Sequence, residues 1–111
     1  MNWKELLALQ QLEEIKLLSF NTPQLIFKHS TRCSISKVAL NRFESVETVA
    51  GVDFYLLDLL NFRNISNEIA EQFKVHHESP QIILIYKGNA VFDESHTAIS
   101  MQEIAEQVAN L

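Results

Sequence analysis

Short apolar runs of strand length alternate along this chain with segments in which apolar residues recur every three to four positions. Three runs predict β-strands, at residues 24–29 (QLIFKH), 52–60 (VDFYLLDLL) and 81–86 (QIILIY). Four segments have the spacing of amphipathic helices, at residues 9–20, 34–49, 64–73 and 98–111. The turn KGN and the run AVF predict a hairpin after residue 86, because Gly88 and Asn89 readily supply positive φ angles. The predicted order is helix, strand, helix, strand, helix, strand, strand, helix.

Each predicted helix carries its apolar residues on one face, which we expect to pack against the sheet. These residues are Leu9, Leu12, Ile15 and Leu18; Ile35, Val38, Ala39, Phe43 and Val46; Ile65, Ile69, Ala70 and Phe73; and Met101, Ile104, Val108 and Leu111. The third helix has Asn64 or Ser66 available as its cap, and the last helix opens with the capping box Ser100-x-x-Glu103.

This order of elements predicts an α/β fold with one domain over residues 1–111. A strand–helix–strand unit followed by a hairpin and a last helix implies a mixed four-stranded sheet. We expect a right-handed first crossover and helices on both faces of the sheet.

Charge and composition argue against several classes of function and location. The net charge of −5 argues against a nucleic-acid partner, which needs a basic surface. No apolar run is long enough to span a membrane, and charges near the start of the chain argue against a secretory signal. A single cysteine suits a reducing compartment, so we expect a cytoplasmic protein.

That cysteine, Cys33, falls between the polar turn HST and the predicted helix that begins at Ser34. A helix start stabilises an anion, and Arg32 adds a positive charge, so this position favours the reactive thiolate. Ser36 lies about one turn further on, where its hydroxyl can point at the sulfur. The alternative is an inert cysteine that fills space in the core, but its polar neighbours argue against that reading.

Together these features resemble a thioredoxin-like fold: a strand, a turn, C-x-x-S at a helix start, a distant X-Pro before a hairpin, and a closing helix. More narrowly, the segments MNWKEL, KHSTRCSIS, ESPQ and ESHTAIS are similar to the monothiol bacilliredoxins, small bacillithiol-linked redox proteins. The resemblance covers nearly the whole chain. It implies a thioredoxin-like fold with an extra N-terminal helix.

The resemblance also implies roles for individual residues. Cys33 is the attacking thiolate, Ser36 occupies the position of the resolving cysteine, and Pro80 is a cis-proline that faces Cys33. The binding groove comprises Thr31, Arg32, Ser34, Ser79, Pro80, Ser95 and His96. Arg32 and Lys28 are either holders of the small thiol's carboxylates or ordinary solvated charges.

The activity that follows is monothiol thiol–disulfide exchange on S-thiolated client proteins. The co-substrate is bacillithiol or glutathione, with no tightly bound cofactor. Two alternatives stay open: a non-catalytic thioredoxin-like adaptor, and a redox-sensing stress protein whose cysteine is only modified. The four histidines match no compact metal motif, so we expect no metal site, although His76 or His77 is placed to line the groove.

Overall fold

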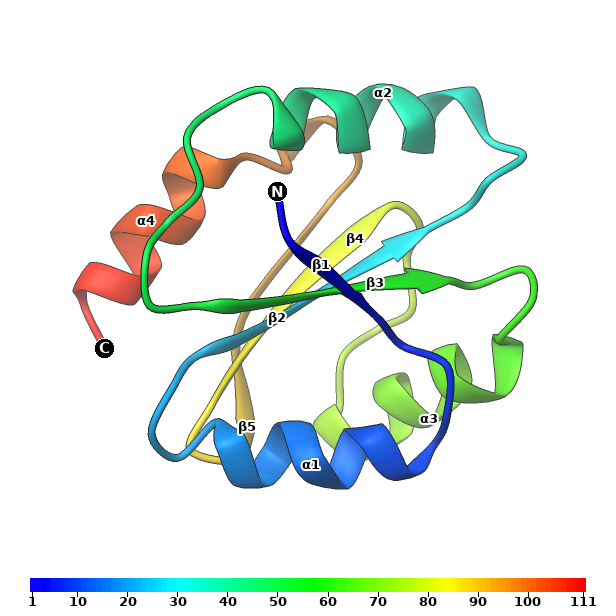
Figure 1. Ribbon diagram of the computed structural model, residues 1–111. Helices are drawn as coiled ribbons and strands as arrows, with labels where there is room; N and C mark the ends of the chain where they lie inside the picture. The colour runs from blue at the N-terminus through cyan, green and yellow to red at the C-terminus, as the bar shows by residue number, and fades with distance from the viewer.

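The computed structural model describes residues 1–111 and contains every helix and strand expected from the sequence (Figure 1). Its elements are β1 (Trp3–Glu5), α1 (Gln10–Leu18), β2 (Gln24–His29), α2 (Ser34–Glu44), β3 (Asp53–Asp58), α3 (Arg63–Phe73), β4 (Gln81–Tyr86), β5 (Asn89–Ser95), the 3-10 turn η1 (His96–Ala98) and α4 (Met101–Ala109). None of the helices is long and apolar enough to span a membrane.

The sheet has five strands in the order β1-β3-β2-β4-β5, one more than the four predicted. The additional strand is β1, in which Trp3 pairs with Phe54 of the parallel β3. Its three residues have no apolar alternation of their own, so β1 depends on pairing with β3 and could not be predicted from the local sequence. β2 and β3 are parallel, and β4 and β5 are antiparallel to their neighbours.

Helices cover both faces of the sheet, as expected: α2 and α4 lie on one face, and α1 and α3 on the other (Figure 1). All six residues of β2 are buried because this strand is paired on both edges and covered on both faces. Alternate β2 side chains serve opposite clusters: Leu25 and Phe27 face α2 and α4, whereas Ile26 packs with α1 and α3.

The buried face of α2 differs from the predicted one. Ala39 and Phe43 are buried as expected, but Ile35, Val38 and Val46 are 56%, 61% and 51% exposed. The helix also ends at Glu44 rather than continuing to residue 49. Its sheet-facing side is completed by Ser36, a polar residue that a hydrophobic pattern does not detect.

Smaller corrections apply to the other elements. Leu9, Leu18 and Leu111 are exposed, while Ala70 and Val108 are half-buried. The N-cap of α3 is Phe62 and lacks a side-chain cap, so neither Asn64 nor Ser66 caps it. In the hairpin turn, the positive φ angles belong to Lys87 and Gly88, not to Gly88 and Asn89. The capping box of α4 is confirmed, since the Ser100 hydroxyl accepts a hydrogen bond from the Glu103 amide at 3.0 Å.

An aromatic cluster joins β1 and α2 to the sheet. The Trp3 and Phe43 rings stack at 6.2 Å, and both approach the Phe54 ring in the neighbouring strand. Phe27 adds edge contacts to Trp3 and Phe43. Such pairs contribute beyond the area they bury, so this cluster positions the helix that carries Cys33.

We expect Phe43→Ala to lower the free energy of unfolding by about 3–5 kcal/mol, because it removes a fully buried ring from this cluster. Val38→Ala on the exposed side of the same helix should cost less than about 0.5 kcal/mol. Urea denaturation followed by circular dichroism measures both values. Equal losses in the two variants would contradict this assignment of the buried face.

Candidate functional site

Cys33 is the N-cap residue of α2 and has an extended backbone, with φ −104° and ψ 120°. Its amide donates a hydrogen bond to the Ser30 carbonyl at 3.2 Å, and its carbonyl accepts from the Lys37 amide at 3.0 Å. The thiol is free and partly exposed, and the first turn of α2 contains no acidic residue. The sulfur therefore belongs to the residue at the positive end of an 11-residue helix.

The Ser36 hydroxyl forms hydrogen bonds with groups other than the Cys33 sulfur. It accepts a hydrogen bond from the Ser30 amide at 3.0 Å and lies 2.7 Å from Nδ1 of His29. Burial lowers the pKa of His29, with Asp58 acting in the opposite direction. The imidazole and the hydroxyl therefore share one hydrogen bond in the buried space between β2 and α2. No hydrogen bond joins Ser36 to Cys33, which differs from the expected arrangement because this side of α2 packs on the end of β2.

Lys28 is fully buried, so it cannot hold the carboxylates of a small thiol. Its Nζ donates to the Ser66 carbonyl at 3.2 Å and lies 3.3 Å from Nδ1 of His77. Burial lowers the pKa of Lys28 to about 8. The pKa of His77 is lowered by burial and then by Lys28. These side chains tie the connection between α3 and β4 to the central strand.

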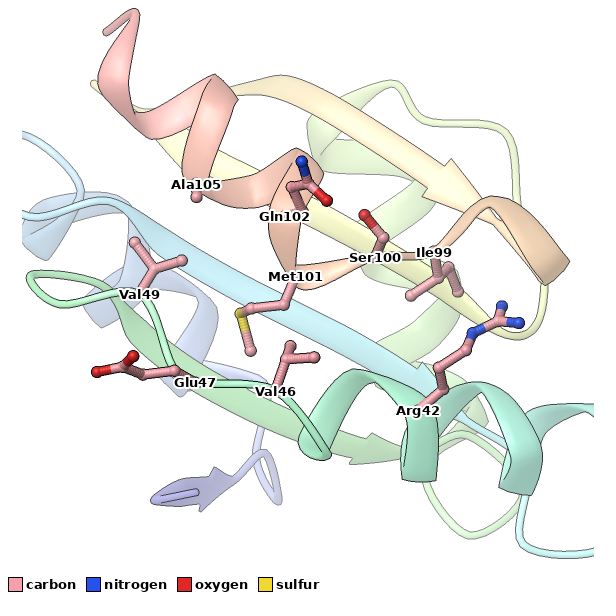
Figure 2. Close-up of a pocket in the computed structure, with 9 residues that line it drawn as sticks. All are labelled: Arg42, Val46, Glu47, Val49, Ile99, Ser100, Met101, Gln102 and Ala105. Atoms are coloured by element: carbon pink, nitrogen blue, oxygen red, sulfur yellow. The ribbon is translucent and has the colours of Figure 1, made fainter.

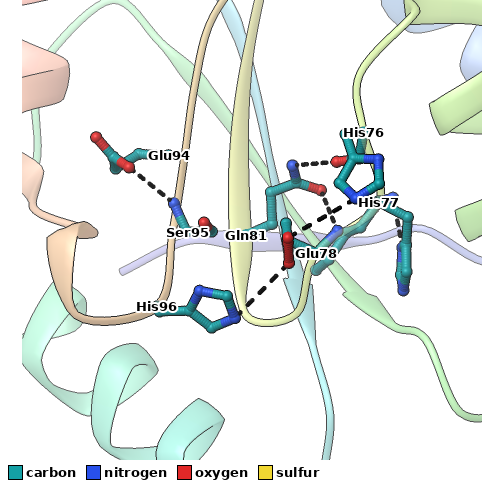
Figure 3. A network of polar contacts seen from close by, with 8 residues as sticks. His76, His77, Glu78, Gln81, Glu94, Ser95 and His96 are labelled. Atoms are coloured by element: carbon teal, nitrogen blue, oxygen red, sulfur yellow. Dashed lines mark hydrogen bonds and ion pairs between the residues drawn. The ribbon is translucent and has the colours of Figure 1, made fainter.

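The peptide bond between Ser79 and Pro80 is cis, as the resemblance implied. The Pro80 carbonyl accepts a hydrogen bond from the His96 amide at 3.0 Å, which joins this loop to η1. Glu78 lies 3.9 Å from both His76 and His96 (Figure 3).

The buried Gln81 holds the same loop by donating to the His76 carbonyl at 2.9 Å (Figure 3). The Ser79 hydroxyl is buried and has no hydrogen-bond partner.

Two apolar cavities at the surface are lined by Ile35, Val38 and Val46, and these side chains are therefore exposed. Ile35 and Val38 line a cavity of about 200 Å³ together with Ser34, Ala39, Arg42, His96 and Thr97. Val46 lines a second cavity of about 420 Å³ between the end of α2 and the start of α4 (Figure 2). Arg42 lies between them and donates to the Thr97 carbonyl at 2.8 Å. Much of the predicted core stripe therefore faces these surface cavities and not the core.

The residues predicted for the site fall into two groups beside Cys33. Ser34 and His96 share the smaller apolar cavity, and Pro80 is joined to His96 through the backbone. Ser95 pairs with Gln81 beside the same loop. Thr31 and Arg32 instead line a polar cavity with Leu60, Asn61 and Arg63.

Sequence reasoning missed three residues of this region. Arg63 has no local signal because it is distant from Cys33 in sequence, and the pairing of β2 with β3 brings its loop to the same end of the sheet. His29 and Gln81 give only a weak signal, as polar residues at the ends of apolar strands. The structure contains no cluster of three or more His, Cys, Asp or Glu side chains arranged to hold a metal ion.

A half-exposed thiol at a helix start, a cis-proline loop and a mixed sheet covered on both faces define a thioredoxin-like thiol protein. The chain matches the family model of monothiol bacilliredoxin BrxC over residues 4–104, and it belongs to that family.

Solved structures agree. One described as a candidate oxidoreductase with a thioredoxin fold has 29% identity and a TM-score of 0.78, covering 92% of this chain and 89% of that one. Thioredoxin from Malassezia sympodialis has 13% identity and a TM-score of 0.72, covering 98% of this chain and 90% of its own. Thioredoxin from Fasciola hepatica has 16% identity and a TM-score of 0.70, covering 96% and 97%. The fold class predicted from the sequence is therefore confirmed.

Ser36→Ala should lower the free energy of unfolding by about 1–3 kcal/mol, because it leaves His29 and the Ser30 amide without their buried partner. The exposed Ser34 offers a matched control, and Ser34→Ala should cost less than about 0.5 kcal/mol. Denaturant titration at neutral pH measures both. A Ser36→Ala variant as stable as the Ser34→Ala variant would refute the anchoring role.

The buried Lys28 predicts a specific dependence of stability on pH. Its pKa is lowered from 10.5 in the unfolded chain to about 8, so the unfolded state binds more protons between these values. Stability should therefore rise from pH 8 to 10, with a slope of at most about 1.4 kcal/mol per pH unit. The window stops at pH 10 because burial raises the pKa of Tyr55 to about 12, which acts in the opposite direction above that pH.

Lys28→Met keeps most of the side chain's length and removes its charge, so the rise between pH 8 and 10 should disappear in this variant. Urea denaturation of both proteins at several pH values provides the comparison. An identical pH profile for the two proteins would show that Lys28 does not titrate in this range.

Proposed function

We propose that this protein removes a low-molecular-weight thiol from mixed disulfides on client proteins, through Cys33 and by a monothiol route. Membership of the bacilliredoxin family supports a thiol redox function. The observation that carries the finer proposal is the position of the chain's only cysteine. Cys33 is partly exposed at the N-terminus of α2, beside the apolar cavity that contains Ser34 and His96.

The first step is attack by the Cys33 thiolate on the small-thiol sulfur of the mixed disulfide. A disulfide forms between Cys33 and the small thiol, and the original S–S bond breaks. The client sulfur leaves as a thiolate and takes a proton from water. The client is thereby reduced, and the small thiol is carried on Cys33.

The second step requires a thiol from outside the chain. Cys33 is the only cysteine, and the residue three positions on is the buried Ser36, which cannot form a disulfide. A second small-thiol molecule attacks the bound small-thiol sulfur and loses its proton. The small-thiol disulfide leaves, and the Cys33 thiolate is restored. Over the cycle the client cysteine is reduced and one free small thiol is oxidised.

We propose bacillithiol as the small thiol, because it gives the family its name, with glutathione as the alternative of similar chemistry. The thiol acts as a co-substrate, and no tightly bound cofactor takes part. S-thiolated proteins of the cytoplasm are the proposed clients. The exposed apolar side chains of Ile35 and Val38 suit contact with the client segment that flanks the modified cysteine.

The same apolar cavities favour a second candidate, a non-catalytic adaptor that binds partners through this surface. Incubation with a bacillithiolated or glutathionylated client, followed by intact-mass spectrometry, separates the two candidates. For exchange, the wild type should gain the mass of the small thiol while the client loses it. Cys33→Ser should lose essentially all of this activity, and Lys37→Ala, at an exposed site of α2 that lines neither cavity, provides a folded control. Absence of the adduct on wild-type Cys33, with the client left thiolated, would refute exchange and favour the adaptor.

A further inference from the structure

A cavity of about 320 Å³ with a cationic lining includes Arg32, the residue before Cys33, and shares no residue with the apolar cavity of Ser34 and His96. Thr31 and Arg32 contribute to it from the turn that follows β2. Leu60, Asn61 and Arg63 contribute from the connection that follows β3. Because β2 and β3 are parallel neighbours, both connections leave the sheet at the same end (Figure 1). η1 follows β5, on the other side of β2 in the sheet order, so the two cavities flank the cysteine.

The two arginines of this cavity have no acidic partners. The chain has 14 acidic residues and 9 lysines and arginines, yet neither the Arg32 nor the Arg63 side chain forms an ion pair or a hydrogen bond within the protein. Asp58, the last residue of β3, instead accepts hydrogen bonds from the Asn61 side-chain amide at 2.7 Å and the Leu60 backbone amide at 3.2 Å. No carboxylate lines the cavity. Both guanidinium groups are therefore available to an anion from outside.

The fold itself gives no reason for an arginine at position 63. Arg63 is the first residue of α3, whose first turn has no acidic residue and no side-chain cap. A positive charge there opposes the helix dipole, which favours anions at this end. The arginine and the uncapped helix end together add to the positive potential of the cavity.

We infer that this cavity binds the carboxylates of the small thiol that Cys33 retains. The inference rests on the proposed function and identifies the part of the substrate that the site recognises. In monothiol exchange the client leaves in the first step, whereas the small thiol stays bonded to Cys33 until the second. Groups adjacent to Cys33 therefore have the longest contact with the small thiol. Arginine suits this role because its guanidinium binds a carboxylate with two parallel hydrogen bonds.

The test compares one uncharged client peptide carrying either of two small thiols. Glutathione supplies two carboxylates, and 2-mercaptoethanol supplies none. The rate constant for release of the client thiol is measured for each peptide at 0.15 M salt. The quantity compared between variants is the rate constant for the glutathione-carrying peptide divided by that for the 2-mercaptoethanol-carrying peptide. Arg63→Glu should lower this ratio about tenfold, as expected for the loss of one charge-assisted contact. Arg63→Lys should give an intermediate ratio because it keeps the charge but loses the bidentate geometry.

Lys37→Glu is the matched control, because it makes the same change of charge on an exposed residue of α2 that does not line the cavity. It should change the ratio less than about twofold at this salt concentration. Arg63→Glu should also unfold at no lower temperature than the wild type, because a carboxylate suits the first turn of a helix. A fall in the ratio therefore reflects recognition and not loss of fold.

Three results would overturn the inference, and they are distinguishable. If the wild type exchanges with neither peptide, the proposed function fails and the cavity loses its role with it. If exchange occurs but Arg63→Glu leaves the ratio unchanged, or Lys37→Glu lowers it equally, only the carboxylate site fails. A second client peptide, with acidic residues beside its cysteine, gives the third outcome. If Arg63→Glu slows exchange with this peptide but not with the uncharged one, the cavity binds the client instead of the small thiol.

Discussion

The burial of β2 on both edges and both faces is the constraint on which the rest of the structure depends. Its neighbours β3 and β4 pair with it along both edges, and the helical layers cover both of its faces. A strand held in this way has a rigid end, and the turn from Ser30 to Cys33 begins there. The cysteine is therefore positioned by the most buried element of the molecule.

Two polar side chains at the end of β2, Lys28 and His29, connect this strand to the segments around it. Lys28 reaches the face covered by α3 and is bonded to Ser66 and His77. His29 points to the opposite face and holds Ser36 in α2. Buried polar groups are costly without partners, so these bonds fix the helix start and the loop before Pro80 relative to each other. Ser36 thus anchors the start of α2 to the end of β2.

Two different surfaces lie near Cys33, and each suits one part of the proposed mixed-disulfide substrate. On the side of η1, the exposed Ile35 and Val38 form an apolar surface suited to a client segment. On the side of α3, Arg32 and Arg63 form a cationic cavity suited to a charged small thiol. The mixed disulfide that joins these two parts would then place its S–S bond at the thiol.

The sequence by itself determined the order of the elements, the helix start at Cys33 and the family likeness, because these depend on local periodicity and on motifs a few residues long. The tertiary structure decided which side of α2 is buried, the presence of β1, the burial of Lys28 and the approach of Arg63 to Arg32. Each of these depends on which strands lie side by side. An amphipathic pattern cannot distinguish Ile35 in a groove from Ile35 in a core, since both positions favour an apolar side chain. In the folded protein Ser36, Ala39 and Phe43 occupy the sheet-facing side of α2, which leaves Ile35 on the outer side.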